Sequence, residues 1–397
     1  MLIRLKSINN AQIFGKKQRM KKIQMVDLQS QYKKIKTEID AAIINVIEQA
    51  NFINGPEVGE FRSDLEKYLN VQHVIPCANG TDALQIALMA LGLKPGDEVI
   101  TPSFTYIATT EVIALLHLVP VFVDVLPDTF CIDPTKIEAA ISPKTKAIVP
   151  VHLYGQCADI DAILEIANKH NLAVIEDTAQ AIGAEYTHKD GSVSKAGTIG
   201  DIGCTSFFPS KNLGCYGDGG AMYTNNAELA VNLKKIANHG QVVKYHHEVV
   251  GCNSRLDTIQ AAILKIKLRD LDNYCAARQK VAAYYDAAFA SIPQITIPVR
   301  DVKSTHVFHQ YTVKLDGVDR TGLINYLSEK GIPSMVYYPL PAHKQGMFKA
   351  FGKENQDLPV TNLLTTQVLS FPIHTEMEEA QLEYITNHII HFINANK

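Results

Sequence analysis

The chain has 397 residues, of which 46% are apolar and 20% are charged, and its formal net charge is −3. This length suits a large domain with a smaller one, and the near-neutral charge gives no indication of a nucleic-acid or membrane-surface partner. No apolar run is long enough to span a bilayer, and the seven cysteines, without a CxxC pair or a Cys/His cluster, argue for a reducing compartment such as the cytoplasm and against disulfides or a metal site.

The N-terminal residues 1–22 are strongly basic. They carry seven Lys or Arg and no acidic residue, but they lack the continuous apolar core of a signal peptide. We interpret them as a disordered tail. Translation from Met20 is the alternative.

The first motif lies where a predicted strand, residues 74–78, leads into an apolar helix, residues 83–91. Between them stand Asn79, Gly80, Thr81 and Asp82. Free N–H groups and the dipole at a helix N-terminus attract phosphate, Gly80 permits close approach, and Thr81 can add a hydroxyl donor. The segment therefore predicts a phosphate-binding site, with an ordinary capping turn as the alternative.

Short apolar runs then alternate with helical segments. The clearest strands are residues 98–101, 119–125, 146–152 and 173–177. Such alternation predicts a mainly parallel sheet with helices on both faces. Asp177 ends the last of these strands, at the edge of the sheet where ligands gather. Its alternative role is to cap the helix that would follow.

Lys211 lies in a turn of small residues, in the segment Thr205 to Gly214, just past an apolar run. Flanking Ser and Gly residues let the backbone approach a flat, phosphate-bearing cofactor, and a lysine there can form a Schiff base. Pyridoxal 5′-phosphate (PLP) also needs a carboxylate on its ring nitrogen, which Asp177 can supply. The three strand ends together predict a PLP site, and for Lys211 taken alone a solvated loop residue is the alternative.

The remaining elements predict a second, smaller unit. After a strand at residues 220–224, the pattern predicts a helix to about His239, a loop, and one long helix from Arg255 to about Ala290. A strand at residues 307–315 and a helix at residues 320–330 then indicate a small α/β domain.

These motifs resemble the nucleotide-sugar aminotransferases of the fold-type I PLP superfamily, from about Ile23 to the C-terminus. The most specific stretches are residues 55–57, 78–84, 102–106, 176–180, 206–220 and 251–257. The resemblance implies a large domain with a mainly parallel seven-stranded sheet, residues 23–285, and a small C-terminal α/β domain, residues 286–397.

The resemblance also implies a role for each matching residue in binding PLP. Lys211 would hold the cofactor as a Schiff base and move the proton between the substrate carbon and the cofactor. Asp177 would pair with the ring nitrogen, and Gln180 would hydrogen-bond the ring 3-oxygen unless it caps a helix. The other implied contacts are the phosphate ligands Gly80, Thr81, Ser206 and Asn253, and the stacking ring of Tyr106, with Phe104 as second candidate and core packing as the alternative for either.

In similar enzymes the residue at Asn253 reaches the phosphate in the neighbouring subunit. This implies a homodimer with shared active sites, although Asn253 could also cap the long helix. The closest resemblance within the family is to the 3-aminotransferases that act on UDP-2-acetamido-3-oxo-glucuronate, with L-glutamate as the implied donor, in surface polysaccharide biosynthesis. It is carried by residues 153–159, 204–220, 239–241 and 245–257.

One substrate contact follows from the chemistry of a uronate. Its carboxylate favours a guanidinium partner, and Arg255 is the candidate, with an ion pair to Asp257 or to a neighbouring helix as the alternative. Tyr337, Tyr338 and His343 are expected on the small-domain side of the substrate cleft, although a turn packed on proline would look similar.

One residue departs from the pattern of the uronate enzymes, which carry a histidine where this chain has Tyr337. A dTDP- or UDP-linked 3-oxo or 4-oxo-6-deoxy sugar is therefore an alternative substrate. A PLP-binding homologue without turnover is the alternative from another class. Lys211 argues against a sugar 3-dehydrase, in which histidine replaces the lysine, and residues 214–219 lack the GxGxxG register of a dinucleotide-binding dehydrogenase.

Overall fold

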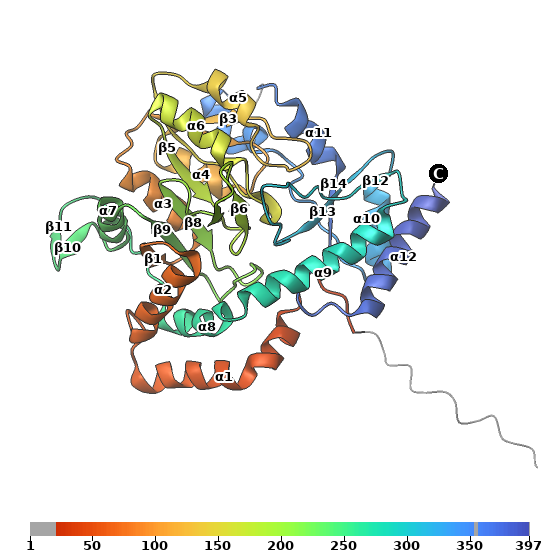
Figure 1. Cartoon of the computed structure of the whole chain (residues 1–397), viewed down its shortest axis with the longest axis horizontal. Helices are drawn as coiled ribbons and strands as arrows, with labels where there is room; N and C mark the ends of the chain where they lie inside the picture. The colour runs from red at the N-terminus through yellow and green to blue at the C-terminus, as the bar shows by residue number, and fades with distance from the viewer. Residues whose placement is uncertain (1–20, 353–355, 397) are drawn as a thin grey trace, which may run out of the picture.

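The computed structural model describes residues 21–352 and 356–396, so nearly all of the predicted basic tail lies outside the described residues. A seven-stranded sheet forms the centre of the large domain (Figure 1). β9 pairs antiparallel with both of its neighbours, and the other adjacent strands are parallel, which confirms the predicted fold class. In spatial order the strands are β1 (His73–Cys77), β9 (Gly220–Thr224), β8 (Ile202–Ser206), β5 (Ala173–Asp177), β4 (Thr145–Ile148), β2 (Glu98–Pro102) and β3 (Val119–Val123).

Helices cover both faces of this sheet because its strands are apolar on both faces. Consecutive strand residues point to opposite faces, and in β5 the buried Val174 and Ile175 belong to two different cores. The helices that pack into these two cores are α3 (Gly80–Ala90), α4 (Ala108–Leu115) and α7 (Ala227–Ala237) on one face, and α2 (Pro56–Leu69), α6 (Ile160–His170) and α8 (Thr258–Leu268) on the other.

Smaller elements surround these layers. α1 (Leu28–Gln49) packs on α8, and a hairpin of β10 (Gln241–Val243) and β11 (His246–His247) lies at the edge of the molecule (Figure 1). The others are α5 (Pro134–Ile137), a short 3-10 helix η1 (Glu138–Ala140), the turn η2 (Leu153–Gly155), β6 (Glu185–Thr187) and β7 (Val193–Lys195). No helix within residues 21–352 and 356–396 has the length and apolar character needed to cross a membrane.

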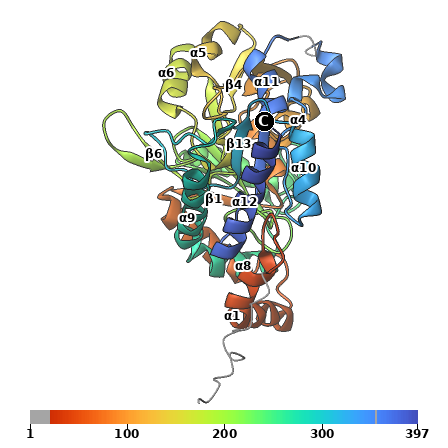
Figure 2. The same cartoon turned by 90° about the vertical axis from the view of Figure 1, so that its right-hand side faces the viewer.

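The small domain is built on a three-stranded antiparallel sheet of β12 (Ile295–Thr296), β13 (Tyr311–Leu315) and β14 (Val368–Phe371). α9 (Leu271–Phe289) runs from the large domain into it, and Figure 2 shows α12 (Glu379–Ala395) between α9 and α10 (Arg320–Glu329). Ile23 also packs into this core. The remaining elements are η3 (Ala342–Lys344), η4 (Gly346–Phe351) and α11 (Pro359–Gln367).

Three predicted elements are wrong in extent, and one of them is the strand expected at residues 146–152, which ends at Ile148. The long helix expected from Arg255 to about Ala290 is divided into α8 and α9, and the strand expected from Val307 begins only at Tyr311. The domain boundary expected between residues 285 and 286 falls inside α9, and it stays a prediction.

Candidate active site

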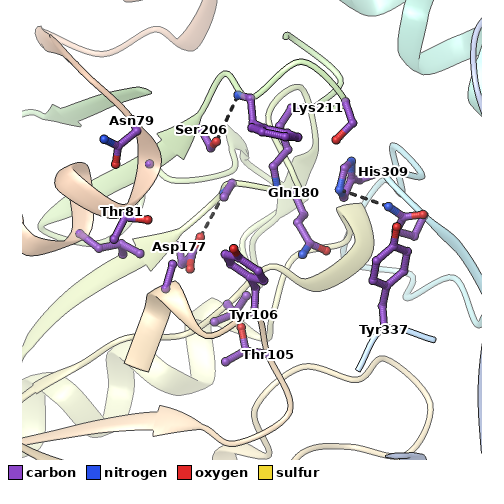
Figure 3. Close-up of a pocket in the computed structure, with 18 of the residues that line it drawn as sticks. Asn79, Thr81, Thr105, Tyr106, Asp177, Gln180, Ser206, Lys211, His309 and Tyr337 are labelled. Carbon is purple, nitrogen blue, oxygen red and sulfur yellow. Dashed lines mark hydrogen bonds between the residues drawn. The ribbon is translucent and has the colours of Figure 1, made fainter. Parts of the chain in front are cut away.

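A pocket of about 820 Å³ opens at the carboxyl ends of the central strands. This is the edge at which open α/β sheets bind ligands, because the loops that follow parallel strands converge there. Figure 3 shows side chains from several loops pointing into it. Nine residues singled out in the sequence line this pocket: Gly80, Thr81, Tyr106, Asp177, Gln180, Ser206, Lys211, Tyr337 and Tyr338.

One wall is the N-terminus of α3, which begins at Gly80. The side chain of Asn79 caps the helix by accepting a hydrogen bond of 2.8 Å from the Asp82 amide. A Cβ on Gly80 would lie 2.7 Å from Cβ of Ser206, and one on Gly220 would lie 2.5 Å from the carbonyl carbon of Asn79. Glycine at both positions therefore lets the helix start meet β8 and β9 closely enough to form an anion cradle.

Asp177, at the end of β5, forms the floor. Its side chain is buried, and its two carboxylate oxygens accept hydrogen bonds from Thr109 Oγ1 at 2.7 Å and from the Ala179 amide at 3.1 Å. Burial raises the pKa of Asp177, and these hydrogen bonds and the charge of Lys211 oppose that rise. A buried carboxylate of this kind favours a cationic partner such as a protonated ring nitrogen.

Lys211 extends into the same pocket from the turn after β8 (Figure 3). Removal of its amine from water lowers its pKa from 10.5 to about 8, and the nearby Asp177 carboxylate opposes this shift. An amine with that pKa is partly unprotonated at neutral pH. Since only the free amine is nucleophilic, the site can form a Schiff base with an aldehyde.

The structure distinguishes the two aromatic candidates for stacking. Phe104 is completely buried in the core, whereas Tyr106 is 57% exposed and lines the pocket. The centroid of its ring lies 6.2 Å from that of Tyr338, which also lines the pocket. Tyr106 is therefore the ring that a flat cofactor can reach.

Gln180 connects the two sides of the pocket. Its Oε1 accepts a hydrogen bond of 2.8 Å from the Tyr154 amide, and its Nε2 donates to the Tyr338 hydroxyl at 2.9 Å. No helix follows it directly, since residues 179–183 form turns. Its amide is thus available to the pocket rather than used as a helix cap.

Three predicted site residues do not line this pocket. His343 is completely buried, with Nδ1 2.7 Å from Ser103 Oγ. Asn253 is exposed and Arg255 half-buried, and within residues 21–352 and 356–396 Arg255 forms no ion pair with Asp257. The roles of His343, Asn253 and Arg255 stay predictions.

Several residues at or next to the pocket were missed by sequence reasoning. Thr109 binds Asp177, and its hydroxyl lies 3.1 Å from Thr105 Oγ1, so the four-residue spacing of two threonines near a helix start was the available signal. His309 and Gln310 also line the pocket. Burial, reinforced by the charges of Lys211 and Arg278, holds the pKa of His309 well below its ordinary value, so this histidine is neutral.

Contacts made by residues 307–310 explain why β13 begins later than predicted. Residues 307–310 are held in the pocket wall by contacts from other elements instead of pairing as a strand. The Val307 amide donates to Gly155 O at 2.8 Å, Asn212 Nδ2 donates to Val307 O at 2.9 Å, and Arg278 donates to the carbonyl of Phe308 at 3.2 Å. The apolar alternation in this segment therefore misled the strand prediction.

One pocket of this α/β fold holds a lysine of lowered pKa, a buried carboxylate and a helix N-terminus. This combination defines the class of PLP-dependent enzymes. Residues 33–390 match the model of the DegT/DnrJ/EryC1/StrS aminotransferase family, and the chain belongs to this family. PLP is its cofactor.

Named relatives extend the comparison. The chain is 49% identical over 363 residues to the UDP-2-acetamido-2-deoxy-3-oxo-D-glucuronate aminotransferase of Pseudomonas aeruginosa, covering 91% of this chain and 98% of the relative. It is 43% identical to the UDP-N-acetyl-3-dehydro-alpha-D-glucosamine 3-aminotransferase of Acidithiobacillus ferrooxidans, covering 91% and 96%. The crystal structure of NtdA from Bacillus subtilis with bound cofactor PMP aligns with a TM-score of 0.85 at 34% identity, covering 93% of this chain and 83% of that one.

Proposed function

We propose that this protein transfers the amino group of L-glutamate to C3 of a UDP-linked 2-acetamido-3-oxo sugar, and that UDP-2-acetamido-3-oxo-glucuronate is the substrate. The observation that carries the chemistry is the placement of Lys211 and Asp177 in one pocket. The choice of sugar is supported by the two named relatives, both of which act on UDP-linked 3-oxo sugars according to their names. The product would supply surface polysaccharide such as O-antigen, with the enzyme in the cytoplasm.

Each pocket residue has a part in this proposal. When bound, PLP withdraws electrons from the substrate carbon and so makes its C–H bond acidic. Lys211 Nζ would hold the cofactor covalently, and as a free amine it would move the proton to and from that carbon. Its pKa near 8 keeps a useful fraction of the amine unprotonated at neutral pH.

The other residues hold and orient the cofactor. Asp177 would keep the ring nitrogen protonated, and Tyr106 would stack on the ring. Gln180 would donate to the ring oxygen, because its Oε1 already accepts the Tyr154 amide and leaves Nε2 as the donor. The phosphate would be held by Gly80, Thr81 and Ser206, and by Asn253 from the neighbouring subunit.

The exposed surface next to Asn253 supports a homodimer. Ile44, Ile47, Phe52 and Ile53 are each about half exposed, and large exposed apolar groups of this kind mark protein interfaces. The segment that carries them joins the one that carries Asn253 and Arg255, since Ile53 pairs with Asp257. In a dimer formed by this surface, Asn253 and Arg255 would reach the pocket of the partner.

Arg255 would then bind the uronate carboxylate, with Tyr337 and Tyr338 on the small-domain side, and the buried His343 would act behind this wall and not by touching the sugar. The Tyr337 departure favours a second candidate, a dTDP- or UDP-linked 3-oxo or 4-oxo-6-deoxy sugar. The discriminating feature is the carboxylate, which only the uronate presents to a guanidinium.

The test is a half-reaction. The enzyme is loaded with pyridoxamine phosphate, UDP-2-acetamido-3-oxo-glucuronate is added, and the return of PLP is followed by its absorption. We expect PLP to reappear, and to reappear more slowly with the matching sugar that lacks the carboxylate. If glutamate still converts the PLP form but the uronate restores none, the sugar assignment is wrong.

A further inference from the structure

Tyr154 has an unusual backbone conformation next to the pocket, although it is not one of the pocket-lining residues. It lies in η2 with φ 58° and ψ −1°, in the left-handed region that a bulky residue seldom adopts. Its side chain is buried, and its ring packs edge-on against Phe130. A strained backbone of this kind persists only where the surrounding structure fixes it, and such sites cluster where function requires a fixed geometry.

The backbone of Tyr154 fixes the orientation of Gln180. An amide N–H can only donate, so the atom of Gln180 that faces it at 2.8 Å must be the carbonyl oxygen. The Nε2 group is therefore the end that turns toward Tyr338, whose hydroxyl it meets at 2.9 Å. Since the Tyr338 hydroxyl accepts this bond, its own proton is free for a ligand.

The side chain of Tyr154 holds the same wall at a second point. Its hydroxyl donates to the carbonyl oxygen of Tyr337, since a carbonyl can only accept. Burial raises the pKa of Tyr154 well above its ordinary value, so the hydroxyl keeps its proton. In addition, the Tyr154 carbonyl accepts a hydrogen bond of 3.3 Å from the amide of Gln310.

These contacts have one feature in common. The residues that Tyr154 bonds to line the pocket: Gln180, Tyr337 and Gln310. Gln180 in turn donates a hydrogen bond to Tyr338. Figure 3 shows Tyr337 on the side of the pocket away from Thr81 and Ser206, where the phosphate cradle lies. Tyr154 thus joins the part of the large domain that meets the cofactor to the part of the small domain that meets the substrate.

We propose that Tyr154 is a positioning residue for the keto sugar: its hydroxyl holds the Tyr337–Tyr338 segment in place against Gln180. This inference rests on the proposed function. The hydroxyl has no contact with Lys211 or Asp177, so its removal acts on the substrate wall and leaves the catalytic lysine and its carboxylate as they are.

The variant Tyr154→Phe removes this hydroxyl and keeps the ring and the backbone. We expect the KM for the keto sugar to rise about tenfold, as the loss of one hydrogen bond with a carbonyl left unpaired implies, and kcat to fall less. The half-reaction with glutamate should stay within about twofold of the wild type. Calorimetry should show the same weakening for binding of the amino-sugar product, independently of turnover.

Tyr285→Phe is the matched control. Tyr285 is also a buried tyrosine that donates to a backbone carbonyl, that of Pro372 at 2.8 Å, but it lies in the small-domain core. The Tyr285→Phe variant should leave both half-reactions unchanged. If Tyr154→Phe slows both half-reactions equally, or changes neither, Tyr154 is a structural residue and the proposal is wrong.

A second variant keeps the test decisive if Tyr154→Phe proves unstable by thermal unfolding. Tyr338→Phe removes the hydroxyl that accepts from Gln180, and it should raise the KM for the keto sugar selectively as well. If Tyr154→Phe does not fold, an unchanged KM in Tyr338→Phe would overturn the proposal. Where both single variants fold, the two losses in the double variant should combine to less than their product, because both act on one segment. Losses that multiply would overturn the coupling, whereas a wild type that transaminates neither glutamate nor any keto sugar would refute the proposed function itself.

Discussion

The carboxylate of Asp177 depends on a threonine from a different element. Thr109 stands at the start of α4, is almost fully buried, and donates to Asp177 Oδ2. This hydrogen bond opposes the effect of burial on the pKa of the carboxyl. Asp177 must be ionised to pair with a protonated ring nitrogen, so Thr109 supports cofactor binding without touching the cofactor.

The variant Thr109→Val keeps the shape of the side chain and removes the donor. We expect the affinity for PLP to fall about tenfold, because a hydrogen bond to a charged group is lost. The pKa of Asp177 should also rise further, so the defect should grow as the pH falls. Titration of the apoenzyme with PLP at several pH values measures both effects.

Thr110→Val is the control for this prediction. Thr110 is the next residue of the same helix and is equally buried, but its hydroxyl donates to the carbonyl of Ile107 at 3.0 Å. Its replacement should leave PLP affinity within about twofold. Equal losses in the two variants would show that Thr109 acts through the stability of α4 alone.

At the scale of elements, the turn η2 lies so close to residues 307–310 that it fixes their position in the pocket wall. Gly155 has φ 114°, and a Cβ there would lie 2.8 Å from the amide nitrogen of Phe308 and 3.0 Å from that of His309. Neither of these atoms can move without displacing residues 307–310. The turn therefore requires glycine for two separate reasons, backbone conformation and space.

Gly155→Ala should consequently destabilise the protein by about 2–3 kcal/mol and lower activity, since His309 and Gln310 move with the displaced segment. Gly191→Ala separates the two causes. Gly191 also has positive φ, 86°, but its Cβ would meet no atom within 4 Å, so only the conformational cost of about 1 kcal/mol applies. Unfolding midpoints in urea compare the two. Equal shifts would contradict the steric argument.

The elements also show which sequence signals were sufficient to predict where a helix or strand begins and ends. Residues 173–177 were predicted as a strand with both ends correct, because a continuous apolar run meets polar residues abruptly. The break between α8 and α9 at Arg269 and Asp270 was missed, since the sequence there contains neither Gly nor Pro and buried leucines continue on both sides. Likewise, the late start of β13 depends on contacts from distant residues, which local periodicity does not contain.

At the scale of the whole molecule, the predicted pocket residues divide by where they stand in the chain. Those that follow strands of the central sheet, such as Gly80, Asp177 and Lys211, converge within one chain because parallel strand ends share an edge. Asn253 and Arg255 follow no strand end of this sheet and lie outside the pocket of their own chain. His343 was placed by resemblance alone, and its burial against Ser103 could not be read from the sequence.

The shared-site homodimer predicts complementation between inactive subunits. Lys211→Ala and Arg255→Ala should each be nearly inactive toward the uronate. In a mixed dimer, one pocket combines an intact Lys211 with an intact Arg255 from the other subunit, and random mixing should restore about a quarter of wild-type activity. Co-expression of the two chains with different tags, followed by an activity assay, measures this recovery.

A second pair of variants controls for the mixing. Lys211 and Asp177 line the same pocket of one chain, so mixing Lys211→Ala with Asp177→Ala leaves every pocket defective and should restore nothing. An absence of recovery with the first pair, in mixed dimers shown to form, would place Arg255 outside the partner's site.

The antiparallel strand β9 has a consequence for how the enzyme acquires its cofactor. Because β8 and β9 are adjacent and Ser206 pairs with Gly220, residues 207–219 form the connection of a hairpin, and Lys211 lies within it. The ends of this connection are fixed by the sheet, and inside it the amides of Phe207 and Cys215 bond to the carbonyls of Gly219 and Phe207. The chain that carries the lysine therefore loses its conformational entropy when the protein folds, and binding of PLP does not have to order it again.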